Sequence, residues 1–169
     1  SKDALAKTQL GAWEYDVVGP WYKCNMTDIM AAIGLRQLDR YPELLKKRRQ
    51  IVEKYDAMCD ELGVKHLMHK GENYQSSNHL YLTRIPNIDD KTRREIIIKL
   101  AERGVNTNVH YKPLPMMTAY KEMGWDIKDF PNAFAYYENL ISLPLHTKLS
   151  DEDVDYIIEN YKAVVKDYI

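Results

Sequence analysis

The stretch YKCNMTDIMAAIGLRQL, residues 22–38, decides how the rest of the chain is interpreted. Thr27 is a favourable helix N-cap, and Asp28 follows it in the first turn, where the helix dipole favours an acidic side chain. Just upstream, Lys23 and Asn25 lie beside the free N–H groups of that first turn. A cation, an amide and a helix N-terminus together suit an anion such as phosphate. From these residues alone, an ordinary capped helix with a solvated lysine is the simpler interpretation.

The composition is typical of a soluble globular chain. Its 169 residues are 45% hydrophobic and 29% charged, which is enough apolar material for one core. The formal net charge of -1 gives no basic excess, so nucleic acid is not expected as a partner. No apolar run reaches the length of a membrane span, so no membrane insertion is expected. Cys24 and Cys59 lack the spacing of a metal or CxxC motif, and we interpret them as free thiols of a cytoplasmic protein.

Apolar periodicity predicts two helices in the first part of the chain. The helix that starts at Thr27 is expected to end near Tyr41, because Pro42 disfavours helical backbone in the residue before it and suits the first turn of a new helix. A second amphipathic helix is predicted over residues 43–62. The charged run KKRRQ at residues 46–50 is interpreted as the solvated face of that second helix.

The remainder alternates strands with helices. A strand, a helix and a second strand are predicted over residues 79–85, 90–103 and 105–110, which is the pattern of a βαβ or split βαβ unit. Ser150 and Asp153 form the capping signal of a final helix. Shorter strands are predicted at residues 64–68 and 140–145, and shorter helices at residues 3–10, 118–123 and 132–139. The expected fold class is α/β, a small sheet with helices packed on one face.

Two aromatic and histidine pairs are candidate binding residues. His110 ends a predicted strand and is followed by Tyr111 and a proline-rich connection, and functional groups often lie in the loops beyond strand ends. A packed, hydrogen-bonded histidine is an alternative interpretation. Trp13 and Tyr15 lie two residues apart, so a strand would place them on one face, for packing or for stacking on a ligand.

No residue is identified as catalytic or as a metal ligand. The chain has no GxGxxG, phosphate-loop, GxSxG or HExxH motif, and no spacing establishes a nucleophile and its base. His66 and His69 flank a predicted strand without carboxylate partners, so metal binding is not expected there.

Five segments, in order, resemble the C-terminal part of the DegT/DnrJ/StrS family of pyridoxal-phosphate-dependent aminotransferases, which act on nucleotide-linked keto-sugars. The segments are WEYDVVGPWYKCNMTDIMAAIGLRQL (13–38), RRQIVEKYDAMCDEL (48–62), SSNHLYLTRI (76–85), LAERGVNTNVHYKPLP (100–115) and ENLISLPLHTKLSDEDVDYII (138–158). The family motifs that they match include G-Y-K-Y-N-M-T-D-I, W-H-L-F-x-I-R, H-Y-x-P-L and L-S-L-P-L. Each motif alone is a weak signal, whereas five in order with compatible gaps are specific.

The resemblance implies a fold type I aminotransferase. Residues 1–41 would form an arm and the first part of a connecting helix that contacts the large domain and the dimer partner. Residues 42–169 would form the small C-terminal α/β domain. The Schiff-base lysine of the family lies in the large domain, and no lysine here has its sequence context. The chain alone is therefore expected to be inactive.

The resemblance also implies roles for six residues. Lys23 and Asn25 would reach across a homodimer to the phosphate of the neighbouring subunit's pyridoxal phosphate. The residues implied in binding the nucleotide-linked sugar are His110, Tyr111, Trp13 and Tyr15.

The implied reaction is amino transfer from a donor such as glutamate to a nucleotide-linked keto-sugar, for cell-surface polysaccharide or lipopolysaccharide. Two alternatives stay open at this stage. Some relatives are sugar dehydratases with a histidine in place of the lysine, and the deciding residue lies outside this sequence. The chain could also be a non-catalytic binding or regulatory module.

Overall fold

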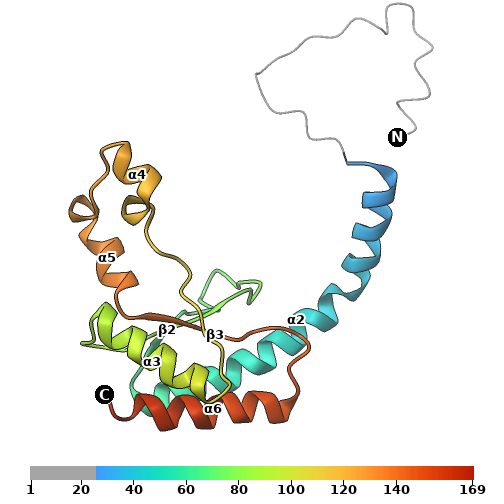
Figure 1. Ribbon diagram of the computed structural model, residues 1–169. Helices are drawn as coiled ribbons and strands as arrows, with labels where there is room; N and C mark the ends of the chain where they lie inside the picture. The colour runs from blue at the N-terminus through green and yellow to red at the C-terminus, as the bar shows by residue number, and fades with distance from the viewer. Residues whose placement is uncertain (1–25) are drawn as a thin grey trace, which may run out of the picture. The chain divides into compact units, whose positions relative to one another are not determined.

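The computed structural model describes residues 26–169, and its elements are labelled as in Figure 1. The chain divides into two units, Ser1–Leu38 and Asp39–Ile169, and each is described by itself. The division expected between residues 41 and 42 stays a prediction, and the helix expected at residues 3–10 lies outside the described residues. In chain order the elements are α2 (Asp28–Leu62), β1 (Lys65–His66), β2 (Tyr81–Arg84), α3 (Asp90–Glu102), η1 (Leu114–Met116), α4 (Thr118–Glu122), η2 (Ile127–Asp129), α5 (Pro131–Tyr137), β3 (Leu140–Leu143) and α6 (Asp151–Val165).

Helix α2 is a single helix of 35 residues, and the prediction of two helices that meet at Pro42 was wrong. The helix begins after Thr27, whose Oγ1 accepts a hydrogen bond from the Met30 N–H at 3.3 Å. A proline inside a helix removes one backbone hydrogen bond, here to the carbonyl of Leu38, and costs about 3 kcal/mol. The side chains that α2 buries all lie beyond Pro42: Ile51, Val52, Tyr55, Met58 and Cys59.

The charged run at residues 46–50 is only partly solvated, which corrects the sequence interpretation. Arg48 and Arg49 are half-buried. Arg48 Nη1 donates to the backbone carbonyls of Asn78 at 3.0 Å and His79 at 3.2 Å. These bonds join α2 to the segment that leads into β2.

The capping signal predicted for α6 is confirmed, and α3 also begins with a side-chain cap. Asp89 Oδ1 accepts the Thr92 N–H at 2.8 Å and starts α3. At α6, Ser150 Oγ accepts the Asp153 N–H at 3.0 Å, and Asp153 Oδ2 accepts the Ser150 N–H at 2.8 Å, which is a complete capping box. Local side-chain chemistry thus fixes where both helices begin.

The sheet has three antiparallel strands in the order β1-β2-β3. The second strand of the predicted split βαβ unit is reduced to one bridge, in which Asn108 pairs antiparallel with Ser142 of β3. Residues 105–110 therefore run parallel to β2 with β3 between them, as a split βαβ unit requires. Asn108 Oδ1 accepts the Val109 N–H at 2.7 Å, and such a local bond competes with a longer strand ladder.

One face of the sheet packs on helices α2, α3 and α6 (Figure 1). The strand residues on this face are Tyr81, Thr83, Ile141 and Leu143, and all four are buried. Tyr161 of α6 donates its hydroxyl proton to Thr83 Oγ1 at 2.9 Å, and Thr83 Oγ1 donates to the Ile141 carbonyl at 3.0 Å. The polar atoms of this face are therefore paired within the core.

Three ion pairs join α2 to α6 along their exposed edges. They are Lys47–Asp151 at 2.9 Å, Lys54–Asp155 at 2.7 Å, and Glu61 with Lys162. Residue numbers rise together along both helices, so α6 runs parallel to the part of α2 that it contacts.

The described residues contain neither a membrane-spanning helix nor a candidate metal cluster. Within residues 26–169, no helix combines the length and the apolar character that crossing a membrane requires. The same residues contain no group of three or more histidine, cysteine or acidic side chains arranged to hold a metal ion.

We expect the free energy of unfolding to fall as the pH rises above about 9. Burial raises the pKa of the Cys59 thiol to about 12 and also raises the pKa of three buried phenols, Tyr55, Tyr81 and Tyr161. These groups stay protonated in the folded chain at a pH where the unfolded chain already ionises. Their contribution to stability is complete below the unfolded pKa values and is lost as the pH rises toward the folded ones. Urea unfolding followed by circular dichroism measures the effect.

The variant Cys59→Ala is the matched control for this prediction. It removes the group with the lowest unfolded pKa of the four, so its stability should fall less steeply between about pH 8 and 10 than that of the unchanged chain. A urea midpoint that stays constant or rises over this range in the unchanged chain would contradict the assignment.

Candidate functional site

Ser142 of β3 holds His110 on the sheet face opposite the helices. Asn108 and Ser142 exchange two backbone hydrogen bonds, of 3.0 and 2.7 Å, which bring His110 beside the strand. His110 Nδ1 lies 2.9 Å from Ser142 Oγ, and Ser142 is buried. This bond fixes the plane of the imidazole ring, while Nε2 finds no partner among the described residues. His110 therefore presents an oriented ring nitrogen to a ligand.

Tyr111 follows with a side chain that is 70% exposed. Its ring meets the His110 ring edge-on, with centroids 4.7 Å apart and an interplanar angle of 87°. The chain then passes through Pro113 into η1, where Leu114 is also exposed. An exposed aromatic ring beside an oriented imidazole can stack on a sugar or base while the imidazole makes a hydrogen bond.

Arg84 connects α5 to the sheet face on which Ser142 and His110 lie. Its Nε donates to Asn139 Oδ1 at 3.0 Å, and its Nη2 donates to the Ala135 carbonyl at 3.0 Å. The guanidinium lies over the Tyr136 ring, 4.3 Å from the centroid. These contacts hold the chain just before β3, and thereby the strand that carries Ser142.

Two of the six predicted binding residues, His110 and Tyr111, lie within the described residues, and their rings are neighbours. The other four lie outside the described residues: Lys23, Asn25, Trp13 and Tyr15.

The described part of the first unit has free donors at the start of α2. The Thr27 side chain and carbonyl accept the N–H groups of Met30 and Ala31, at 3.3 and 2.9 Å. The N–H groups of Asp28 and Ile29 have no acceptor within the helix. Such N–H groups occur at any helix start and suit an anion, and the phosphate contact of Lys23 and Asn25 stays a prediction.

Ser142, the partner of His110, was not predicted from the sequence. A serine within the apolar run LISL carries no local sign of function, and it lies 32 residues from His110 along the chain. Period-two alternation was the one available signal, because it places Ser142 on the face opposite Ile141 and Leu143.

The expectation that His66 has no carboxylate partner was wrong. His66 Nδ1 lies 3.1 Å from Asp56 Oδ1, and Nε2 lies 3.3 Å from Asp60 Oδ1. Only the Nε2 contact is aligned as a hydrogen bond. Both carboxylates come from the preceding helix α2, one turn apart, which brings them to the same side of the strand.

Comparison with known proteins decides the family. Residues 4–162 match the DegT/DnrJ/EryC1/StrS aminotransferase family. The chain belongs to this family. The match extends over nearly the whole chain and confirms the resemblance drawn from the five sequence segments.

Curated and solved members of the family are similar to the chain over most of its length. The spore coat polysaccharide biosynthesis protein SpsC of Bacillus subtilis is 36% identical over 162 residues, which cover 92% of this chain and 41% of SpsC. The PMP-form of the putative sugar aminotransferase Spr1654 from Streptococcus pneumoniae has 56% identity and a TM-score of 0.83, and covers 100% of this chain and 42% of that one. Its PLP-form gives 55% identity and a TM-score of 0.82, with 95% and 41% covered.

The match covers well under half of each of these relatives. The chain spans about two fifths of the length of SpsC and of the Streptococcus pneumoniae protein. The chain is therefore an α/β chain built like part of a PLP-dependent sugar aminotransferase. This follows from the family match and from the PLP-form and PMP-form structures.

We expect Ser142→Ala to release the His110 ring from its fixed orientation. The variant removes the hydroxyl beside Nδ1 and should cost about 1 kcal/mol of unfolding free energy, the usual value of one hydrogen bond. The ring-nitrogen NMR shifts of His110 report its tautomer, and we expect them to move toward those of a free imidazole.

His69 is the internal control in the same spectra, because its Nδ1 makes an equivalent bond of 2.7 Å to Ser76 that the substitution leaves intact. The positioning role of Ser142 is refuted if the His110 shifts in Ser142→Ala match those of the unchanged chain while the His69 shifts also stay in place.

Proposed function

We propose that this chain supplies the small C-terminal domain and the dimer-contacting arm of a pyridoxal-phosphate-dependent aminotransferase of cytoplasmic location. The reaction moves an amino group from a donor such as glutamate to a nucleotide-linked keto-sugar for cell-surface polysaccharide. The family match over residues 4–162 carries this proposal. A relative of the chain from Campylobacter jejuni, 26% identical over 155 residues, is named UDP-4-amino-4,6-dideoxy-N-acetyl-beta-L-altrosamine transaminase, which supports the substrate class.

The start of α2 fits one part of the cofactor, its phosphate. The free N–H groups of Asp28 and Ile29 would bind phosphate oxygens, with Lys23 and Asn25 adding a cation and an amide from the preceding residues. Pyridoxal phosphate, when bound, supplies the electron sink that amino transfer needs. The covalent lysine would come from another part of the enzyme, so the chain alone is inactive.

The second face of the sheet would bind the sugar nucleotide. His110, with its ring held by Ser142, offers Nε2 to a hydroxyl or phosphate oxygen of the substrate. The exposed Tyr111 ring provides a surface for stacking. Trp13 and Tyr15 are proposed to complete the same pocket.

A chimera tests the proposed function directly. This chain would replace the matching segment of the Streptococcus pneumoniae protein, with which it shares 55% identity in the PLP-form. We expect the chimera to convert from its PLP-form to its PMP-form when L-glutamate is added, followed by the absorbance of the bound cofactor. The chain alone, mixed with pyridoxal phosphate and L-glutamate, is the control and should show no such conversion.

The parent protein in its unchanged form sets the reference rate for this experiment. A well-folded chimera that binds the cofactor but does not respond to L-glutamate, beside a parent that does, would refute the proposal.

The exposed apolar side chains of the first unit support a homodimer contact. Met26, Ile29, Met30, Ile33, Leu35 and Leu38 are each more than half exposed. Burying a side chain of this size is worth about 1.5–3 kcal/mol, so several together favour association. We propose that this part of α2 is covered by the large domain and by a second subunit in the assembled enzyme.

We therefore expect the isolated chain to self-associate, and Ile33→Lys to weaken the association by at least about tenfold. Analytical ultracentrifugation over a range of concentrations measures the dissociation constant. Ile98→Lys is the matched control, since Ile98 of α3 has a similar exposed fraction, 57% against 55%, but lies in the second unit. A monomer at the highest concentrations, or equal effects of the two substitutions, would exclude the proposed contact.

A further inference from the structure

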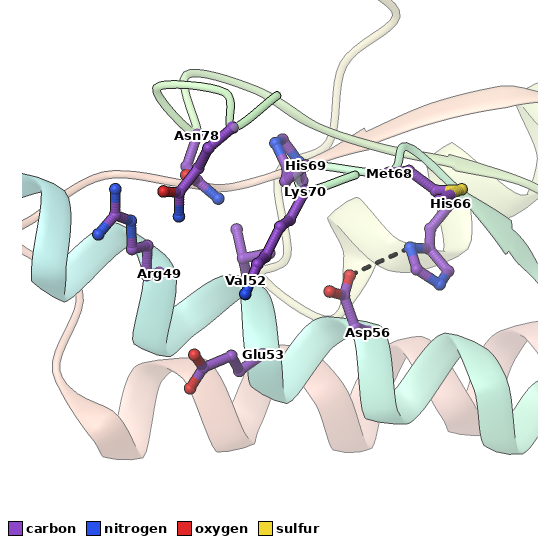
Figure 2. Close-up of a pocket in the computed structure, with 10 residues that line it drawn as sticks. Arg49, Val52, Glu53, Asp56, His66, Met68, His69, Lys70 and Asn78 are labelled. Atoms are coloured by element: carbon purple, nitrogen blue, oxygen red, sulfur yellow. Dashed lines mark ion pairs between the residues drawn. The ribbon is translucent and has the colours of Figure 1, made fainter. Parts of the chain in front are cut away.

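A pocket of about 510 Å³ opens between α2 and the segment of residues 66–78, within the second unit (Figure 2). Arg49 and Glu53 line it from α2, while His69, Lys70 and Asn78 line it from the facing segment. The site proposed above for the sugar nucleotide uses none of these residues. Two elements that are distant in sequence thus enclose a polar hollow to which no function has been assigned.

His69 lines this pocket and is buried, with 6% of its surface exposed. Its Nδ1 lies 2.7 Å from Ser76 Oγ, and Ser76 Oγ also accepts the Asn78 N–H at 3.0 Å. We assign the ring hydrogen to Nε2, with the Ser76 hydroxyl donating to Nδ1 while it accepts the Asn78 N–H. Burial lowers the pKa of His69, so the ring is neutral at neutral pH. Nε2 is therefore a donor, and it has no partner among the described residues.

Two further polar atoms in the lining, Arg49 Nε and Asn78 Oδ1, are buried with neither a hydrogen bond nor a charged neighbour paired to them in the described part of the chain. His66 Nδ1 also lacks a hydrogen bond but lies 3.1 Å from Asp56 Oδ1. Asn78 is 3% exposed, and its backbone carbonyl is held by Arg48 Nη1 at 3.0 Å, so the residue is fixed in place. An unpaired buried polar atom costs about 1–3 kcal/mol. A ligand that paired all three atoms would recover this cost on binding.

The available charges in the pocket have both signs. Arg49 and Lys70 are cationic and Glu53 is anionic, and no ion pair joins them to other described residues. Asp56, the remaining acid, already accepts the Tyr81 hydroxyl at 2.7 Å and lies beside His66. The pocket thus offers cationic and N–H donors together with a carboxylate and an amide oxygen.

We propose that this pocket binds a small zwitterion of the α-amino acid class. Its carboxylate would face Arg49, His69 and Lys70, and its ammonium would face Glu53 and Asn78 Oδ1. A fully ionised anion would leave the buried Asn78 Oδ1 without a donor, whereas the ammonium of a zwitterion can donate to it. The inference concerns residues 49–78 alone and does not rest on the proposed amino transfer.

Titration of the 169-residue chain with L-alanine tests the site, followed by the ring-proton NMR signals of His69. We expect a saturable shift of these signals. Propionate keeps only the carboxylate and ethylamine only the ammonium, so each should bind at least about tenfold more weakly than L-alanine. Inorganic phosphate and glucose, in separate titrations, represent the anion and sugar alternatives and should also bind more weakly.

Two substitutions assign the two ends of the ligand. Glu53→Gln should weaken the binding of L-alanine by at least about tenfold and leave the binding of propionate unchanged. Arg49→Gln should weaken the binding of both ligands. Glu53 is exposed, so its variant keeps the fold, which the dispersion of the NMR spectrum verifies. Glu159→Gln, an equal charge change on the exposed side of α6, is the matched control and should bind L-alanine as the unchanged chain does.

The proposal is overturned by any of three results. They are the lack of a saturable His69 shift with L-alanine, tighter binding of phosphate or glucose than of L-alanine, and an unchanged L-alanine affinity in Glu53→Gln.

Discussion

Strand β3 is buried on both faces, and it contributes side chains to the core on one face and to the candidate site on the other. All four of its residues are buried. Ile141 and Leu143 face the helices, where the Thr83 and Tyr161 hydroxyls pair with the strand backbone and with each other. Ser142 faces the other way and orients His110. A shift of β3 by one residue would exchange these faces, placing a serine in the apolar core and removing the partner of His110. The geometry of the proposed substrate site therefore depends on the strand register.

Much of the fold was predictable because its signals are local. Ser150 and Asp153 mark the start of α6, and Asp89 marks the start of α3. A helix cap depends only on residues that are neighbours in the sequence. The boundary predicted at Pro42 was wrong because a helix can continue through an interior proline at a cost of about 3 kcal/mol, and no neighbouring residue signals that it does so. The order of five motifs gave the family, which no single local signal could have given.

The sites were harder to predict than the fold because their contacts are long-range. His110 stood out by its place before a proline-rich loop, but its partner Ser142 looked like any strand residue. Arg49 belongs to the charged run at residues 46–50, which was predicted to be the solvated face of a helix. Its neighbours across the pocket, His69 and Asn78, are brought to it only when residues 66–78 fold back over α2. Pairings of this kind are set by tertiary structure and leave no periodic trace in the sequence.

The three ion pairs between α2 and α6 have a consequence for the alignment of the two helices. Exposed pairs add little to stability, about 0–1 kcal/mol each. Their signs, however, run lysine, lysine, glutamate along α2 and aspartate, aspartate, lysine along α6. Sliding α6 back by two turns would bring Lys162 next to Lys54 and Asp155 next to Lys47, so one attraction of the native alignment would be replaced by a repulsion while another would remain. The charge pattern therefore favours the native alignment of the two helices by a small margin.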